Sequence, residues 1–196
     1  MDTAIQESRR TKLVVACMLL GSAWSFASSI FGGGWASATA ITALITAIDL
    51  AFIIRYRDTL FARLFVFGLA AGFTELIADA WLVDATQTLV YSQGGPFVWR
   101  SPLYMPFAWG NIVAALGYIG WRLGRDWPPL FAALAMATFG AFYIPAFEYW
   151  AAGADWWTYR NTTALGAAPL SIIAAEFLII LAVPFATRVA GGPPLW

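Results

Sequence analysis

Two carboxylic acids lie four residues apart in an apolar stretch of the chain, GFTELIADAW at residues 72–81. Side chains four positions apart share one face of a helix, so Glu75 and Asp79 are expected to project together. A charged group in the hydrocarbon of a membrane costs at least about 2.5–3.5 kcal/mol and is by default a functional candidate. A protonated acid beside an ionised one can donate and remove protons. We therefore predict a catalytic, proton-handling pair; for Asp79, hydrogen bonding that merely holds helices together is the alternative.

Other acids lie in further apolar stretches. Glu176 has apolar sequence on both sides and is predicted to be a third catalytic residue, which takes a closing proton. Asp49 continues a stripe of threonines, and Glu148 lies near enough to a membrane boundary for simple solvation to be the alternative. No basic residue lies at matching depth. We expect some of these acids to be protonated at neutral pH, because desolvation and like-charged neighbours both disfavour the charged form.

Aromatic residues accompany the acids: the chain contains 11 Trp, 7 Tyr and 15 Phe. Part of this content is the belt expected at a membrane interface. Aromatic rings also stabilise positive charge by about 0.5–2 kcal/mol each without acting as nucleophiles. An acid pocket with aromatic walls suits an apolar substrate that becomes a carbocation, as in metal-free isoprenoid cyclisation. The predicted substrate-binding residues are Asp49, Trp81, Tyr104, Trp109, Asn111, Tyr143 and Glu148.

The elements that must position these residues are membrane helices. The 196 residues are 61% hydrophobic and only 11% charged, a composition far from that of soluble domains. We predict an all-α, polytopic helix bundle that forms a single transmembrane domain over residues 1–196. A spanning helix needs about 20 residues, and six segments qualify: 12–31, 36–55, 62–83, 103–122, 128–150 and 169–188.

The basic residues predict the orientation of this bundle. Nine fall on one side of the predicted helices and only Arg100 and Arg160 on the other. Positive charge concentrates in cytoplasmic segments, so both termini are expected in the cytoplasm of what we take to be a bacterial cell. The segments 84–102 and 151–168 then face outward as interfacial segments rich in Trp and Tyr.

Residue types that are rare or absent exclude several classes of protein. The chain has no histidine, which argues against a metal-dependent membrane oxygenase. The only lysine, Lys12, lies near the amino end, so no lysine within the membrane is available for a retinal Schiff base. A single cysteine, Cys17, excludes a disulfide within the chain. We expect no metal, no cofactor and no nucleic-acid partner, and the oligomeric state is left open.

Three stretches carry a resemblance to known proteins: GFTELIADAW, SPLYMPFAWGN and FYIPAFEYW. In size, helical architecture and the combination of acids with aromatic rings, the chain resembles the small integral-membrane terpene cyclases of meroterpenoid and indole-diterpene pathways. It is similar to the same degree to carotenoid hydratases and cyclases of bacterial membranes. The resemblance implies proton-initiated cyclisation or isomerisation of a lipid-soluble isoprenoid, with acidic residues as proton donors.

Two other classes of function fit the same residues. Buried carboxyls serve as proton relays in transporters, and kinks at Pro145 and Pro184 could act as hinges. A carotenoid- or lipid-binding subunit of a membrane complex is the third interpretation. An aromatic cavity that opens sideways to lipid favours the enzyme, whereas a water path to both faces favours the transporter.

Overall fold

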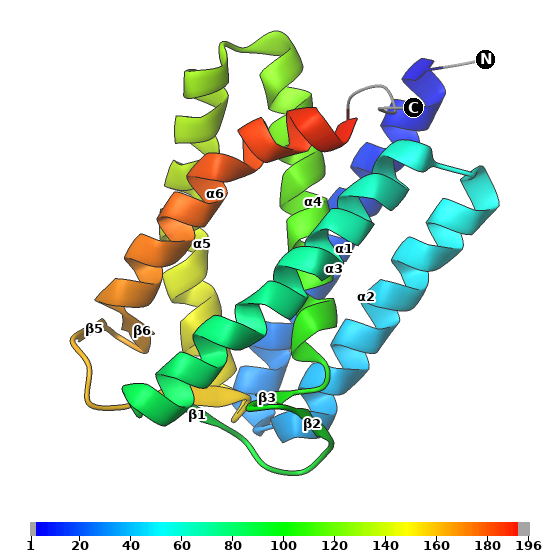
Figure 1. The fold of residues 1–196 in the computed structure, drawn as a ribbon. Coiled ribbons are helices and arrows are strands. Elements are labelled where there is room, and N and C mark those ends of the chain that lie inside the picture. The colour runs from blue at the N-terminus through cyan, green and yellow to red at the C-terminus, as the bar shows by residue number, and fades with distance from the viewer. Residues whose placement is uncertain (1–2, 192–196) are drawn as a thin grey trace.

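Each of the apolar stretches forms one long α-helix in the computed structural model, which describes residues 3–191 (Figure 1). The helices are α1 (Thr3–Phe31), α2 (Gly34–Tyr56), α3 (Thr59–Ala80), α4 (Met105–Asp126), α5 (Pro129–Gly153) and α6 (Leu170–Gly191). The prediction of an all-α bundle is therefore confirmed. Five of the helices in the described chain, all except α4, are long and apolar enough to cross a membrane.

The two ends of the bundle have different structures. Both described chain ends lie at one end, which we call the terminal end, and short strands lie at the other, which we call the strand end (Figure 1). At the terminal end Asp58 accepts a 2.6 Å hydrogen bond from Nε of Arg10, and Glu7 binds Arg122 and Arg125 at 2.6 Å each. These contacts engage the polar first turns of α1, which explains why α1 begins before the apolar stretch.

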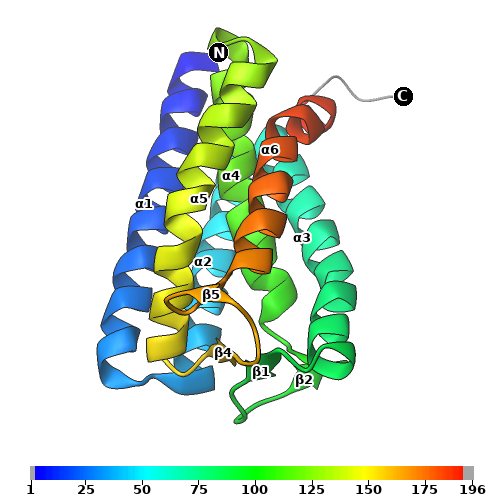
Figure 2. The same cartoon turned by 90° about the vertical axis from the view of Figure 1, so that its left-hand side faces the viewer.

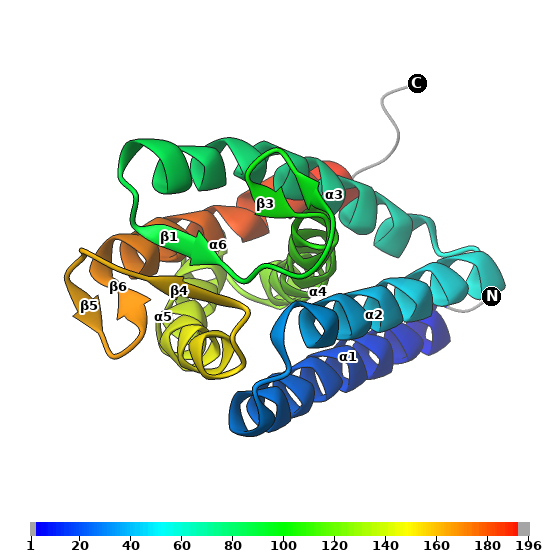
Figure 3. The ribbon, with the colours of Figure 1, turned by 90° about the horizontal axis from the view of Figure 1, so that it is seen from below.

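Helix α4 lies inside the bundle, where each of the other five helices contacts it (Figure 3). Half of its residues are buried. Two glycines of α3 allow the closest approach: a Cβ atom on Gly68 would lie 2.5 Å from the carbonyl oxygen of Gly110, and one on Gly72 would overlap the carbonyl of Pro106. Gly68 and Gly72 form a GxxxG pair, the spacing of small residues at which neighbouring helices in membranes approach closely. Because its neighbours surround it, α4 tolerates a less apolar sequence than they do.

Three small antiparallel sheets form the strand end (Figure 2). Strand β2 (Phe97–Val98) pairs with β3 (Ser101–Pro102), and β5 (Ala164–Leu165) pairs with β6 (Ala168–Pro169). Strand β1 (Leu89–Tyr91) follows the π-helix η1 (Trp81–Ala85) and pairs with β4 (Trp157–Tyr159) from the other long connection. The β1–β4 sheet, which we call the strand lid, lies across the end of the bundle between α3 and α5 (Figure 3).

The strand lid was not predicted from the sequence, where only interfacial segments were expected. Its register places Tyr91 opposite Trp157 and Leu89 opposite Tyr159. Leu89 and Tyr91 are buried while Val90 between them is exposed, the alternation typical of a strand with one covered face. Each strand has only three residues, and its partner lies more than sixty residues away in the chain. Pairing of this kind leaves little signal in either segment alone.

Candidate functional site

All six helices and the strand lid contribute residues to one cavity of about 240 Å³ inside the bundle. Four carboxylic acids line it. Glu75 and Asp79 come from α3, Glu148 from α5 and Glu176 from α6. The proposed pair on α3 and the third acid of the sequence analysis therefore meet at a single cavity, together with a fourth acid.

Asp79 is bound by two hydroxyl groups from the strand end. Its side chain is 5% exposed, and its Oδ2 atom accepts hydrogen bonds from the Tyr91 hydroxyl at 2.6 Å and the Ser101 hydroxyl at 2.7 Å. Tyr91 belongs to β1 and Ser101 to β3. Two O–H donors on one carboxyl oxygen match the needs of a carboxylate, which can only accept. Asp79 is thus held as an acceptor at the strand end of the cavity.

Glu148 has a similar arrangement on the other side of the strand lid. The indole Nε1 of Trp157 donates a 2.7 Å hydrogen bond to Oε2 of Glu148. Because Trp157 stands opposite Tyr91 in the strand register, neighbouring side chains of the two strands bind acids on two different helices. The strand lid therefore connects α3 with α5 through their carboxyl groups.

The other two acids have no such partners. Glu75 and Glu176 line the cavity and are half-buried, and neither side chain makes a hydrogen bond or an ion pair with any residue between positions 3 and 191. Among the described residues, no lysine or arginine lines the cavity. These two carboxyls are free to act on a molecule inside it.

Aromatic rings form much of the remaining wall. Four of the residues predicted to bind substrate line the cavity: Tyr104, Trp109, Asn111 and Tyr143. Phe147 packs against Tyr143 with ring centroids 6.1 Å apart, so the ring surface continues along α5. Asn111 also donates to the backbone carbonyl of Thr42 at 3.2 Å and accepts from Thr46 at 3.1 Å, which ties α4 to α2.

Two residues predicted for the site lie elsewhere. Trp81 is 60% exposed on the outside of the bundle. It follows Asp79 by two positions, which turns it about 200° around the helix axis. Asp49 is buried next to Cys17, whose sulfur lies 3.9 Å from its Oδ1 atom. Cys17 lines the cavity but Asp49 does not.

The residues of the strand lid were not among the predicted site residues. Its Tyr159 lines the cavity; burial raises the pKa of its phenol well above the ordinary value of 10.0, and the four carboxyls raise it further. Burial, followed by the charge of Asp79, likewise raises the pKa of Tyr91. Trp157 was assigned to the membrane interface. The only local signal was the two-residue spacing of large side chains in LVY and WTY.

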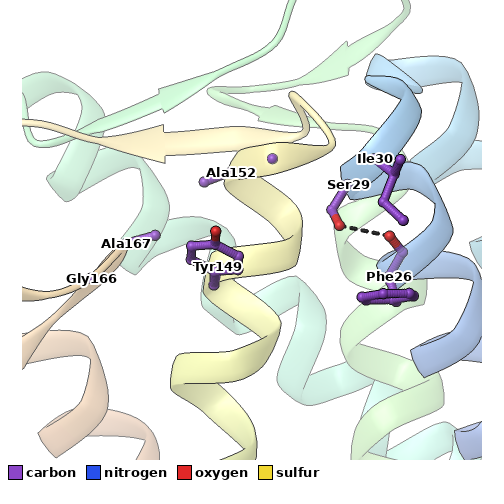
Figure 4. Close-up of a pocket in the computed structure, with 8 residues that line it drawn as sticks. Phe26, Ser29, Ile30, Tyr149, Ala152, Gly166 and Ala167 are labelled. Carbon is purple, nitrogen blue, oxygen red and sulfur yellow. Dashed lines mark hydrogen bonds between the residues drawn. The ribbon is translucent and has the colours of Figure 1, made fainter.

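A second hollow, of about 510 Å³, lies on the outside of the bundle (Figure 4). Phe26, Ser29 and Ile30 of α1 face Tyr149 of α5 across it. Its residues include no carboxyl group, and the Ser29 hydroxyl already donates to the carbonyl of Phe26 at 2.6 Å. This hollow has the character of an apolar surface groove, so the acidic cavity is the candidate site.

The acidic cavity reaches the side of the bundle at α6. Of the lining residues that the structure describes, only Ala175 and Ile179 are exposed. They lie one helical turn apart and therefore share one face of α6. Glu176, the residue after Ala175, lines the same cavity from the inside. Helix α6 thus forms a side wall of the cavity that is exposed on the outside of the bundle, while the strand lid covers the end of the cavity.

Fold and site together define an all-α protein with membrane-type helices around a cavity lined by acids and aromatic rings. The chain belongs to a family described as a domain of unknown function, DUF6989, whose model matches residues 76–196, more than half of the chain. The match includes Asp79, Glu148 and Glu176 and begins directly after Glu75. Neither the curated proteins nor the solved structures include a match to this chain.

Proposed function

We propose that this protein is a membrane-embedded enzyme that applies acid–base chemistry to a lipid-soluble isoprenoid, in a proton-initiated cyclisation or isomerisation. The observation that carries the proposal is the cavity itself, where the described lining combines four carboxyls and aromatic walls with no basic side chain. Such a lining can give a proton, stabilise a cation and take a proton back.

The hydrogen bonds of the acids suggest a role for each. Asp79 and Glu148 already accept hydrogen bonds from the strand end, which suits groups that stay in place. Glu75 has no hydrogen-bond partner within residues 3–191, so we assign it as the proton donor. Its O–H proton adds to an alkene carbon, the π electrons form the new C–H bond, and a carbocation remains on the neighbouring carbon.

Glu176 completes the reaction in this scheme. After ring closure or rearrangement, a C–H bond next to the cationic carbon breaks. Its electrons form the product alkene, and its proton passes to the Glu176 carboxylate. Glu176 enters the cavity from α6, a different helix from that of Glu75, so it can act on a different part of the substrate. The rings of Trp109 and Tyr143 stabilise the cation between these two steps.

The proposed membrane placement has six crossings with both termini in the cytoplasm of a bacterial cell. The polar contacts of Arg10, Arg122 and Arg125 at the terminal end support it, since basic residues favour the cytoplasmic side. In this placement the exposed face of Ala175 and Ile179 meets lipid. Reporter fusions should find both termini inside the cell and residues 84–102 outside, and an external carboxyl terminus would contradict six crossings.

The location of the acids favours an enzyme over a proton-coupled transporter. Between the cavity and the terminal end lies a buried apolar cluster that includes Val14, Phe52, Leu64 and Phe65. A transporter requires a polar path to both faces, and these side chains separate the cavity from the polar contacts of the terminal end. A lipid-binding subunit of a larger complex remains the alternative if purified protein binds isoprenoids without converting them.

The test uses purified protein in detergent, where vectorial transport has no meaning. The wild type is incubated with a panel of prenylated substrates, beside Glu75→Gln and the control Asp126→Asn, which changes an exposed acid at the terminal end. Glu75→Gln keeps the size and polarity of the side chain but removes the transferable proton. Turnover should fall by about 10²–10⁴ in this variant and remain normal in Asp126→Asn. Equal activity in the two variants would remove Glu75 as the donor.

A further inference from the structure

We propose that the acidic cavity holds its substrate by a neutral oxygen atom, such as that of a hydroxyl, ether or carbonyl group, which accepts hydrogen bonds from Tyr104 and Trp156. This inference rests on the proposed function and names the class of substrate. It excludes a prenyl diphosphate and a pure hydrocarbon as the natural ligand.

The first observation is a pair of unused donors. The Tyr104 hydroxyl and the Trp156 indole Nε1 are buried and have no hydrogen-bond partner among residues 3–191. Their side chains are 5% and 2% exposed, and both line the acidic cavity. Buried polar groups in folded proteins are almost always hydrogen-bonded. Two unpaired donors in the wall of one cavity therefore indicate an acceptor that enters with a ligand.

The surrounding acids do not use these donors. Tyr104 lies within electrostatic range of Asp79, but Oδ2 of Asp79 already accepts from Tyr91 and Ser101. Trp156 packs against Trp157 with ring centroids 6.1 Å apart, and it is Trp157 that donates to Glu148. The lid and the helices thus satisfy both acids and leave the two donors beside them unoccupied.

A third unpaired donor has a different location. The indole Nε1 of Trp35 is also buried, without a hydrogen-bond partner in the described part of the chain. However, Trp35 does not line the cavity, and its ring meets the edge of Tyr104 at a centroid distance of 6.2 Å. Gly95, in the connection between β1 and β2, lies so close to Trp35 that a side chain at position 95 would overlap the indole. Trp35 therefore packs against Tyr104 outside the cavity and takes no part in the proposed hydrogen bonds to the substrate.

The charge of the lining decides which acceptor fits. A diphosphate requires arginine, lysine or a bound cation to neutralise it. The cavity has four carboxyls and neither lysine nor arginine, and no group of three or more His, Cys, Asp or Glu side chains in the described chain is arranged to hold a metal ion. An anionic head group would be repelled. A neutral oxygen satisfies both donors without adding charge.

The test measures equilibrium binding to the detergent-solubilised full chain with four probes that share one hydrocarbon chain: farnesol, farnesene, farnesyl diphosphate and farnesylamine. Titration calorimetry gives the dissociation constants without requiring turnover. Farnesol should bind more tightly than farnesene, and farnesyl diphosphate should not bind. Tyr104→Phe and Trp156→Phe should each weaken farnesol about 3- to 10-fold, the value of one lost hydrogen bond, and leave farnesene unchanged. Unchanged farnesene binding also shows that the variants are folded.

Tyr149→Phe provides the matched control, because it removes a phenol hydroxyl on the outside of α5, where the side chain is 65% exposed. It should alter none of the four affinities. Equal binding of farnesol and farnesene in the wild type, equal losses for both probes in the variants, or farnesylamine binding tighter than farnesol and insensitive to Tyr104→Phe would each overturn the inference. A protein that passes this test but converts no isoprenoid keeps the inferred contact and loses the proposed enzymatic function.

Discussion

The hydroxyl of Tyr91 donates a 2.6 Å hydrogen bond to Oδ2 of Asp79 and so joins a strand at the end of the bundle to an acid inside it. The residue opposite Tyr91 in the strand register, Trp157, does the same for Glu148 at 2.7 Å. Two connections that are distant in the sequence thus depend on each other to hold two acids in place. The strand lid is part of the site and not merely its cover.

Removing one of these donors should destabilise the folded protein. Tyr91→Phe deletes the hydroxyl but keeps the ring, and a hydrogen bond to a charged group contributes about 1.5–3 kcal/mol. Because the Ser101 hydroxyl still binds Asp79, we expect a loss at the lower end of this range. Denaturant unfolding of the detergent-solubilised protein measures it. Thr158→Ala changes an exposed position of the same strand lid and should stay within about 0.5 kcal/mol of the wild type; equal losses in the two variants would contradict the role of the bond.

Stability should also decline in alkaline solution because of Tyr91 and Tyr159. Burial raises the pKa of both phenols in the folded protein above their ordinary value of 10.0. Above pH 10 the unfolded chain releases these protons while the folded chain keeps them, so the unfolded state gains stability as the pH rises. The contribution is complete below pH 10 and is lost as the pH approaches the folded values.

Ultraviolet absorption of phenolate provides the measurement. A titration of the folded wild type against Tyr159→Phe should give no difference in phenolate signal just above pH 10. The same comparison in denaturant should differ by roughly half the signal of one tyrosine, because a free phenol with a pKa of about 10 is half ionised there. A difference that appears in the folded proteins at pH 10 would mean that Tyr159 is not buried against the acids.

Access to the cavity should depend on the exposed face of α6. A cavity of 150 Å³ holds a benzene molecule, so 240 Å³ holds roughly ten carbon atoms at the same filling. A longer isoprenoid must extend past Ala175 and Ile179. We expect Ala175→Trp to reduce kcat/KM severalfold for a long substrate and much less for a short one. Leu178→Trp, at a neighbouring position that is 62% exposed and does not line the cavity, is the control. Similar effects of both changes on both substrates would place the entrance elsewhere.

The helices and the meeting of the acids were within reach of the sequence. Apolar stretches interrupted by Glu75, Asp79 and Glu176 predicted both membrane-type helices and inward faces, because a carboxyl inside a bundle must avoid the apolar surroundings. The position of a residue along its helix predicted the lining of the cavity less well than the direction in which its side chain points. Trp81 lies within one turn of Asp79 along the helix but points the opposite way, and Asp49 shares a stripe with threonines while its carboxyl meets Cys17.

The strand lid was not predictable from local pattern. Tyr91 and Trp157 belong to loops whose Trp and Tyr content is equally typical of a membrane interface. Their function in the fold depends on a ladder of three residue pairs between segments that are far apart in the chain. Sequence spacing reports which residues share a face within one element, but it does not report which loops will pair.

The enclosed position of α4 has a consequence for how the protein is made. A newly synthesised helix enters the bilayer readily when it is apolar enough by itself, and within the described chain α4 is the helix that does not meet this condition. Gly68 and Gly72 on the preceding helix, α3, provide the surface against which it packs most closely. We therefore expect α3 and α4 to leave the translocation machinery together, as one helical hairpin. In Gly72→Leu the larger side chain would keep α4 from packing against α3, so the first effect would be failed insertion of α4 into the membrane during synthesis.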